Sequence, residues 1–468
     1  MRHLNLLALL SVPLALLVSG CSGGNSIGHT TQTITFDNPG TQTVGAPLTL
    51  SAKANSGLTV SFTSATPSVC TVSGSIATFG AAGTCTINAS EAGNSTYAAA
   101  SQVAQSFTVN PAIGSTTTIY IAGYAISTAS TASNIVTVAE VWRLTSGNPT
   151  TTAAALSMPS GMTSAQANAI AVSGSDVYVV GFAANSTGRT AVYWLNGTAT
   201  TLPTPSGMTL SAANAIAVSG SNVYVAGYES NSAGNGNAVL WVNGTPTTLS
   251  PPSGIANSYA AAMTVSGSNV YVAGTAWNNS NDNTAVYWLN GTVTTLAMPS
   301  GLTGNYYAEG IAVSGGNVYV SGITMPSAGA DTAISWLNNG PATTLPIPPN
   351  DSAGDYGDGG ITVSGSNVYV AGSGSNGTSS VTNAAYWTNG TPTTLPMPSG
   401  IKSSDATSWA SVIALSGSDV YAVGSLDDSA AGLASTATYW VNAGEATLLP
   451  MPSGTYESWA SAIAVATQ

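Results

Sequence analysis

The stretch AVYWLNGTATTLPTPSG, residues 191–207, contains the unit from which most of this 468-residue chain is built. It combines an aromatic strand, an Asn-Gly turn, a threonine-rich strand and a closing Pro-Ser-Gly. Alternating apolar and polar residues between Gly, Asn and Pro clusters are typical of short β-strands. The same pattern continues along the chain, only 5% of which is charged. We therefore predict an all-β protein with a large buried core.

The unit occurs seven times between Ser115 and Gln468. In the second copy its four strand-like segments are residues 169–174, 176–181, 191–196 and 198–203. Repeats of roughly 40 to 50 residues with four strands are typical of propeller blades. Each copy has one tryptophan, which we expect to pack between blades rather than to contact a ligand. These tryptophans are Trp142, Trp194, Trp241, Trp288, Trp336, Trp387 and Trp440.

The two ends of the repeat array complement each other. The first copy lacks the AIAV-type strand that begins the others, and the chain ends on a surplus strand of that type, residues 461–468. Closing a sheet array into a ring protects its open edges. We therefore predict that the C-terminal strand completes the first blade of a seven-bladed β-propeller, residues 115–468.

The amino-acid sequence of the repeats also resembles that of other proteins. Units that read VSGSDVYVAG or a close variant, followed by AxYWxNG and a Thr-Leu strand, resemble bacterial repeat proteins of unknown function. The units are similar in outline to kelch blades but lack the kelch double glycine. The resemblance covers the whole repeat array and implies a secreted or surface propeller with no established activity.

The first 20 residues have a basic start at Arg2, an apolar run over residues 4–18 and a small-residue exit, as in a secretory signal peptide. Residues 17–21, LVSGC, resemble a bacterial lipobox, which implies that Cys21 is lipidated and becomes the mature N-terminus. Ser22, in place of Asp, implies sorting to the outer membrane. Residues 21–32 would then be a lipidated tether, with the protein in the cell envelope, facing the periplasm or the surface. The alternative is an ordinary cleaved signal with an incidental cysteine.

Residues 33–111 are predicted to form a separate small sandwich of short strands. Cys70 and Cys85 are the only cysteines after Cys21, and in an exported chain we expect them to form a disulfide. The run from QTITF through PSVCTV and AAGTCTI to QSFTVNP resembles bacterial Ig-like modules. That resemblance implies a β-sandwich that serves as a spacer or an adhesive module.

One face of the predicted propeller varies much more between repeats than the other. The turns after the first and third strands are short and nearly constant, whereas the connections at the opposite face vary in length and composition. Rigid scaffolds commonly recognise ligands through such variable loops. Four aromatics occupy one register position there, and we expect them to form part of a ring around the channel mouth. Such a ring could stack on sugars or clamp a peptide. The four aromatics are Tyr259, Tyr307, Trp409 and Trp459. Alternatively, each covers the end of its own blade.

Catalytic machinery is not evident in the sequence. After signal removal the only histidine is His29, in the tether, so no Ser-His-Asp triad or histidine metal site can form. Asp351, Asp355 and Asp358 do not have the spacing of a calcium loop. We predict no catalytic residue, cofactor or metal site. A carbohydrate-active enzyme using carboxylates of the variable face remains an alternative.

The net charge of -12 and the five Lys and Arg residues argue against nucleic acid as a partner. The features together favour an exported, lipid-anchored, monomeric binding or adhesion protein, whose propeller presents one face to a glycan or protein ligand. A structural envelope scaffold without a small ligand is the second hypothesis.

Overall fold

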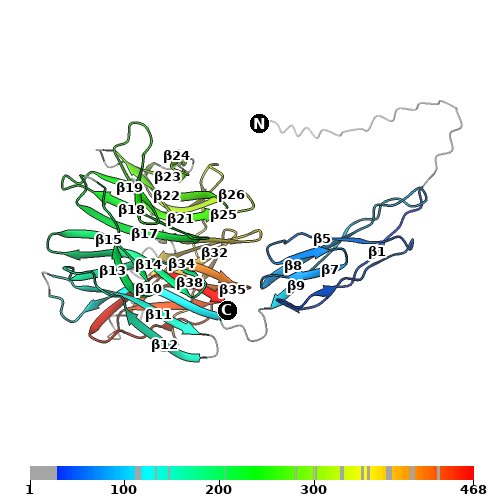
Figure 1. Cartoon of the computed structure of the whole chain (residues 1–468), viewed down its shortest axis with the longest axis horizontal. Coiled ribbons are helices and arrows are strands. Elements are labelled where there is room, and N and C mark those ends of the chain that lie inside the picture. Colours follow the sequence, from blue (N-terminus) through cyan, green and yellow to red (C-terminus); the bar gives the residue numbers. More distant parts are fainter. Residues whose placement is uncertain are drawn as a thin grey trace, which may run out of the picture.

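The structure is a computed structural model of the whole chain. It describes residues 29–110, 117–131, 134–145, 148–205, 207–278, 280, 282–298, 300, 303–326, 331–348, 351, 353–355, 359–375, 382–399, 401, 406–428 and 433–467. The predicted signal peptide and Cys21 lie outside these residues. Within them the fold is all-β, and no helix has the length and apolarity needed to cross a membrane. The strands form a small body and a larger propeller-like body (Figure 1).

The small body consists of nine short strands around one core. They are β1 (Ile34–Thr35), β2 (Gln42–Thr43), β3 (Leu48–Thr49), β4 (Lys53–Ala54), β5 (Ser61–Ser64), β6 (Cys70–Ser73), β7 (Ile76–Phe79), β8 (Gly83–Ser90) and β9 (Val103–Asn110). One sheet has the order β2-β9-β8-β5, a second β3-β7-β6, and β1 pairs with β4. Alternate residues of β8 are buried, including Cys85 and Ile87, because one face of this strand is turned to the core.

The predicted disulfide is confirmed. Cys70 on β6 and Cys85 on β8 are joined at an S–S distance of 2.06 Å. The two strands belong to different sheets, so the bond links the sheets through the core. A cross-link over 15 residues stabilises a domain by about 3 kcal/mol in the chain-entropy model.

The larger body contains seven sheets among the described residues, numbered here in chain order of their tryptophans. Sheet 1 consists of β10 (Thr117–Ser127), β11 (Thr137–Thr145), β12 (Asn148–Ala155) and β38 (Thr455–Thr467). Sheet 2 consists of β13 (Ser164–Ser173), β14 (Asp176–Asn185), β15 (Gly188–Leu195) and β16 (Thr198–Thr201). Sheet 3 consists of β17 (Leu210–Ser219), β18 (Asn222–Ser230), β19 (Gly236–Val242) and β20 (Thr245–Leu249).

The remaining sheets repeat this antiparallel order. Sheet 4 consists of β21 (Asn257–Ser266), β22 (Asn269–Trp277), β23 (Asn283–Leu289) and β24 (Thr292–Thr295), and sheet 5 of β25 (Gly304–Ser314), β26 (Asn317–Pro326), β27 (Thr332–Leu337) and β28 (Thr343–Thr344). Sheet 6 consists of β29 (Ala353–Asp355), β30 (Ile361–Ser364), β31 (Asn367–Ser375), β32 (Thr382–Thr388) and β33 (Thr391–Thr394). Sheet 7 consists of β34 (Thr407–Ser416), β35 (Asp419–Asp428), β36 (Leu433–Val441) and β37 (Thr447–Leu448).

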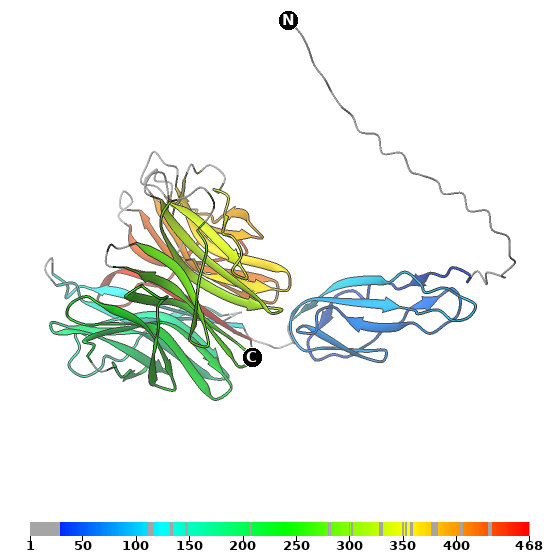
Figure 2. The same ribbon diagram turned by 90° about the horizontal axis from the view of Figure 1, so that it is seen from above.

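The C-terminal strand belongs to the same sheet as the first strand of the large body. β38 pairs antiparallel with β10 over most of its length, from Thr467 opposite Thr117 to Thr455 opposite Ser127. The surplus strand of the sequence therefore completes sheet 1. Figure 2 shows the sheets side by side, with β38 lying among the strands from the start of the array.

The core of the large body is divided into wedges between neighbouring sheets, each with one tryptophan. All seven repeat tryptophans are at most 2% exposed. Trp241, for example, packs on Val180 and Leu202 of the preceding repeat, and its indole Nε1 donates a hydrogen bond to the Pro203 carbonyl at 2.8 Å. The equivalent bond from Trp142 goes to Pro450, so the last repeat contacts the first in the same way. One side chain thus satisfies both the packing and the hydrogen bonding of each wedge.

Candidate functional site

In six of the seven sheets the innermost strand carries a β-bulge, and the residue at the bulge lines the central cavity. In sheet 3 the pairing with β18 passes from Ala213 to Ala215 and leaves Asn214 outside the ladder. A Cβ at Gly227, across from the bulge, would lie 2.0 Å from the Ala212 carbonyl oxygen, so this position requires glycine. Five further sheets show the same register shift. The residues left outside the ladder are Asn168, Asn214, Ala261, Glu309, Ser411 and Ser461.

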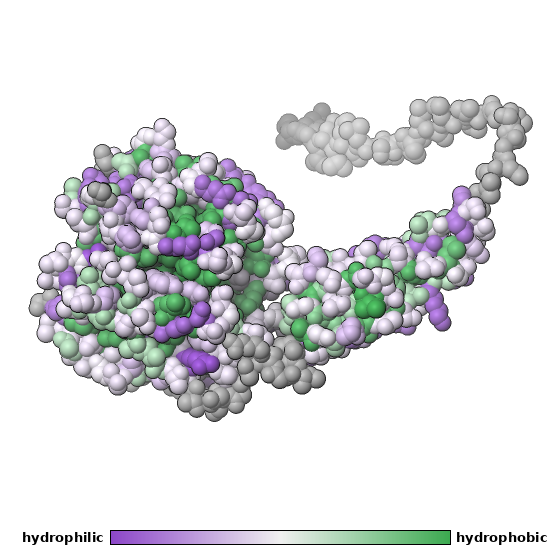
Figure 3. Space-filling view, viewed as in Figure 1, coloured by the Kyte–Doolittle hydropathy of each residue, from purple (hydrophilic) through white to green (hydrophobic). Residues whose placement is uncertain are grey.

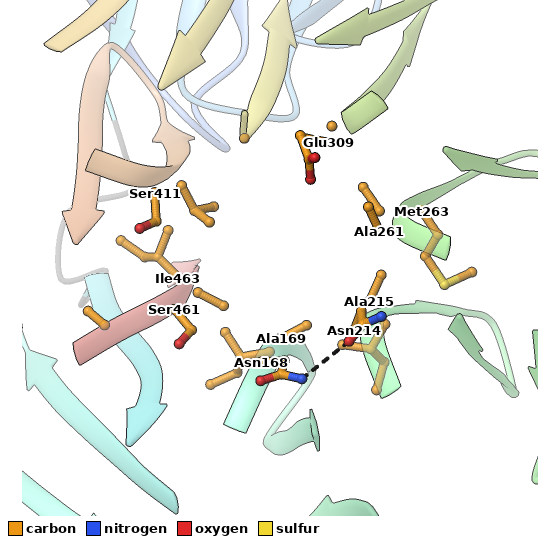
Figure 4. Close-up of a pocket in the computed structure, with 18 of the residues that line it drawn as sticks. Asn168, Ala169, Asn214, Ala215, Ala261, Met263, Glu309, Ser411, Ser461 and Ile463 are labelled. Atoms are coloured by element: carbon orange, nitrogen blue, oxygen red, sulfur yellow. Dashed lines mark hydrogen bonds between the residues drawn. The ribbon is translucent and has the colours of Figure 1, made fainter. Parts of the chain in front are cut away.

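These residues line a central cavity of about 420 Å³ to which all seven sheets contribute. Figure 4 shows Asn168, Asn214, Glu309, Ser411 and Ser461 around the opening, with apolar side chains such as Met263 and Ile463 between them. Around this cavity wall, polar side chains such as Asn168 and Ser411 alternate with apolar ones such as Met263. A cavity of this size and mixed polarity accommodates a small ligand or one end of a longer one.

Two of the asparagines also connect neighbouring sheets. The Asn168 side-chain amide donates to the Ala213 carbonyl at 2.9 Å and to Asn214 Oδ1 at 3.3 Å. The Asn214 amide in turn donates to the Ala260 carbonyl at 2.8 Å. The chain of bonds therefore runs across sheets 2, 3 and 4 at the cavity wall.

A band of half-buried aromatic residues, here named the aromatic rim, lies next to the bulges on the variable side. The second cross-strand pair beyond the bulge, one pair past the glycine, contains an aromatic residue in six of the seven sheets, as Ala212 and Tyr228 illustrate in sheet 3. In sheets 4, 5 and 7 it lies on the innermost strand, and in sheets 2 and 3 on the second strand. Sheet 1 has one on each strand. The rim consists of Tyr124, Phe182, Tyr228, Tyr259, Tyr307, Trp409 and Trp459.

The four aromatics singled out in the sequence thus lie at one level, on four different sheets. Among the described residues, the ring contacts of two of them involve partners that the sequence did not indicate. Trp459 stacks on Tyr124 at a centroid distance of 5.1 Å and 21°, and both line the central cavity. Tyr259 packs at 5.2 Å on Tyr228 of the neighbouring sheet. The signal for the missing members was the aromatic directly after the VYVxG glycine in the first three repeats.

Among the residues that the structure describes, one cation, Arg189, lies within this rim. The Arg189 guanidinium carbon is 4.8 Å from the Phe182 ring centroid and 5.1 Å from that of Tyr228. Burial lowers the pKa of Arg189, which nevertheless remains a cation, and nearby Tyr259 opposes that shift. Sheets 2, 3 and 4 thereby form one continuous aromatic and cationic cluster.

Buried carboxyl groups occur at the same end of the large body. Glu140 on β11 is 2% exposed and lines a second cavity, of about 370 Å³, beside residues 451–455. Burial raises its pKa to about 7, and its Oε2 has no hydrogen-bond partner among the described residues. Burial also raises the pKa of Glu229, although a hydrogen bond from Thr248 at 3.4 Å opposes the shift. Both glutamates occupy positions that are apolar in most other repeats.

Four further carboxylates bear on metal binding or catalysis. Asp351 accepts a hydrogen bond from Asn383 at 2.9 Å, while the Asp355 side chain and Asp358 lie outside the described part of the chain. Within that part, no group of three or more His, Cys, Asp or Glu residues could hold a metal ion. Glu309 is the one carboxylate that the described residues place on the wall of the central cavity. Burial, together with Glu309 and Asp331, raises the pKa of Tyr307.

Figure 3 shows polar residues as scattered spots on the large body, with apolar side chains reaching the surface between them. The basic residues of the whole chain number five against 17 acidic ones. A phosphate-rich partner would therefore find few cations to pair with.

No family model and no curated protein matches this chain. Among solved structures it is similar to an alpha-L-arabinofuranosidase from Clostridium thermocellum, at 14% identity and a TM-score of 0.26, over 45% of this chain and 82% of that one. A GH43 endo-arabinanase from Bacillus licheniformis matches at 13% and 0.28, over 48% and 96%. A quinonprotein alcohol dehydrogenase-like protein from Bacteroides thetaiotaomicron matches at 12% and 0.34, over 91% and 96%. At these values the comparisons assign no activity or ligand.

Proposed function

We propose that this chain is an exported, lipid-anchored binding protein whose seven-bladed β-propeller presents its aromatic rim and central cavity to a glycan. The seven sheets would be the seven blades. The pairing of β10 with β38 and the hydrogen bond from Trp142 to Pro450 support closure of the ring. The small body would be an Ig-like spacer between the propeller and the membrane.

The observation that carries the proposal is the aromatic rim next to a polar cavity wall. A pyranose ring has apolar C–H faces that pack on flat aromatic side chains, and hydroxyl groups that need hydrogen-bond partners. Stacking surfaces are offered by Trp459 and Tyr259, and hydrogen-bonding groups by Ser411, Ser461 and Glu309 on the cavity wall. Charged side chains are few here, with Glu309 on the cavity wall and Arg189 in the rim, which suits a ligand that is largely uncharged.

The test is a glycan array probed with the full-length protein and two matched variants. Trp459→Ala with Tyr259→Ala removes rim rings from two sheets. Tyr456→Ala removes an aromatic that is 45% exposed on the same strand as Trp459 but outside the rim, and serves as the control. We expect selective glycan binding that the rim variant weakens by roughly tenfold or more and the control leaves unchanged.

Two results would count against the proposal. Absence of binding to any glycan by the folded parent would remove the glycan ligand and favour a protein partner or a scaffold role. Binding that survives in the rim variant would place the site elsewhere. Circular dichroism and the melting temperature of each variant show whether it is folded.

The lipid anchor is a separate part of the proposal and rests on the LVSGC segment before Ser22. Cells fed a clickable palmitate should label the wild-type protein but not a Cys21→Ser variant. An unlabelled wild type would favour an ordinary cleaved signal. Protease treatment of intact cells then distinguishes display at the surface from a periplasmic location.

A further inference from the structure

Arg189 has the placement of a binding residue rather than of a surface charge. It lies at the start of β15, half-buried, with its guanidinium between the rings of Phe182 on the same sheet and Tyr228 on the next. Such stacking holds the guanidinium plane in place and leaves its edge free to donate. The side chain is therefore oriented before any ligand arrives.

The donors of this guanidinium are not used within the described part of the chain. There it contacts the two ring faces and lies near Tyr259, and its five N–H groups make no hydrogen bond or ion pair. Partial burial without a counter-charge disfavours the cation, so the protein carries a desolvation cost that a carboxylate ligand would offset. Arginine pairs with carboxylates through two parallel hydrogen bonds, which makes that group the best match.

A second arginine offers an internal comparison. Arg143 also lies over a tyrosine, with its guanidinium carbon 5.7 Å from the Tyr120 centroid, but it is exposed and has a ring on one side only. It lies on β11, whereas Arg189 belongs to the rim cluster that continues to Tyr259 through the 5.2 Å contact with Tyr228. Of the two arginines that the structure describes, Arg189 alone has a ring on either side and further aromatic surface next to it.

We infer that Arg189, Tyr228 and Tyr259 form a subsite for a sugar acid, with Arg189 binding the carboxylate and the tyrosines contacting the pyranose ring. This inference rests on the proposed glycan-binding function and deepens it. One guanidinium neutralises one carboxylate, and the net charge of -12 repels a polyanion. The ligand class is therefore a largely neutral glycan that carries an isolated uronic acid, not a polyuronate.

The arginine side-chain resonances provide a direct test. The chain contains three arginines, Arg2, Arg143 and Arg189, so the Nε–Hε region of an NMR spectrum of the full-length protein is simple to assign. Methyl glucuronoside should shift the Arg189 signal and leave Arg143 unchanged, while methyl glucoside at equal ionic strength should move neither. An Arg189 signal that does not respond, or one that moves together with Arg143, overturns the inference.

Variants test the same site by affinity. Arg189→Gln should lower binding of a glucuronate-bearing xylo-oligosaccharide by roughly tenfold, and Arg189→Lys should restore only part of it, because lysine lacks the planar fork. Arg143→Gln is the matched control and should have no effect. In the Arg189 variants the loss of binding should be much larger for the charged than for the uncharged xylo-oligosaccharide, and Arg143→Gln should change neither.

The outcomes separate this inference from the proposed function. Glycan binding that is equal for charged and uncharged oligosaccharides, and indifferent to Arg189→Gln, overturns the sugar-acid subsite but leaves the glycan function standing. Failure of the glycan function gives a different result: no oligosaccharide, charged or uncharged, binds the folded parent, and the Arg189 signal does not respond to methyl glucuronoside. Preference for acidic peptides over sugar acids at Arg189 overturns the inference in favour of a protein ligand.

Discussion

The two ends of the seven sheets are built by different rules. At the constant end, Asn196 has φ 50° and the following Gly197 φ 85°, as a type I′ hairpin requires. At the variable end, the rim aromatic comes from the first strand in some sheets and from the second in others. Backbone conformation dictates the residue at the constant end, whereas the sheets share only the presence of an aromatic side chain at the variable end, in six of the seven. That freedom is what a recognition surface needs.

The constant turns are held by more than backbone preference. The Asn196 side chain accepts a hydrogen bond from the Val177 amide at 2.9 Å and donates one to Asp176 at 2.9 Å. The same pair of bonds ties the first hairpin to the second in five other sheets, at Asn243, Asn290, Asn338, Asn389 and Asn442. Asparagine therefore both adopts the positive φ of each turn and supplies the two side-chain hydrogen bonds.

The largest difference in stability should be between two Trp→Ala variants, one in the core and one in the rim. Trp241→Ala removes a fully buried ring and its hydrogen bond to Pro203, and should lower the free energy of unfolding by about 3 to 5 kcal/mol. Trp459→Ala, at the half-buried rim, should cost much less stability but weaken glycan binding. Urea unfolding and array binding of both variants provide the measurements. Equal stability losses would show that the rim is part of the core.

The next largest effect should be a pH dependence of the stability that is caused by Glu140, at the variable end. Glu140 lies where five other repeats have Val, Ile or Ala and one has Thr438. Because burial raises its folded pKa from 4.5 to about 7, the native state retains a proton that the unfolded chain loses above about pH 4.5. The stability that this proton contributes is fully present below about pH 4.5 and is lost as the pH rises through about 7.

The variant Glu140→Gln cannot titrate, so its stability relative to wild type should increase by about 2 to 3 kcal/mol from about pH 4 to pH 8. Urea unfolding at several pH values measures this difference. Asp176→Asn, at a turn of the constant end, is the control and should change the relative stability little. A flat difference for Glu140→Gln would mean that the carboxyl is solvated.

The constant turns should respond to smaller changes. Asn243→Ala forces an alanine into φ 50° and removes two side-chain hydrogen bonds, and should cost about 1 to 2 kcal/mol. Asn243→Gly tolerates the backbone conformation and loses only the bonds, so it should be milder. Thermal unfolding compares the two variants. If glycine is as harmful as alanine, the hydrogen bonds and not the dihedral angle determine the turn.

Much of the scaffold could be predicted because it depends on local chemistry repeated along the chain. Three sequence features each predicted one structural element. The Asn-Gly pairs predicted the hairpin turns, the single tryptophan per unit predicted the packing between sheets, and the surplus strand at residues 461–468 predicted the completion of sheet 1. The rim was only half predicted, since Phe182 and Tyr228 lie on second strands and join it through cross-strand register. A shift of one residue, as at Asn214, decides which side chain faces the cavity. The recurrent glycine of VYVxG was the visible trace of that bulge.

The smallest effect concerns the asparagines of the cavity wall. Asn168→Ala and Asn214→Ala each remove an amide that spans two sheets, but the freed carbonyls face a cavity that water can enter, so each should cost about 0.5 to 1 kcal/mol. Because the two side chains also contact each other at 3.3 Å, the double variant should cost less than the sum of the single losses. A urea-unfolding double-mutant cycle measures that coupling. Strict additivity would mean that the two asparagines act independently, and that the cavity wall is available for ligand hydrogen bonds without disturbing the scaffold.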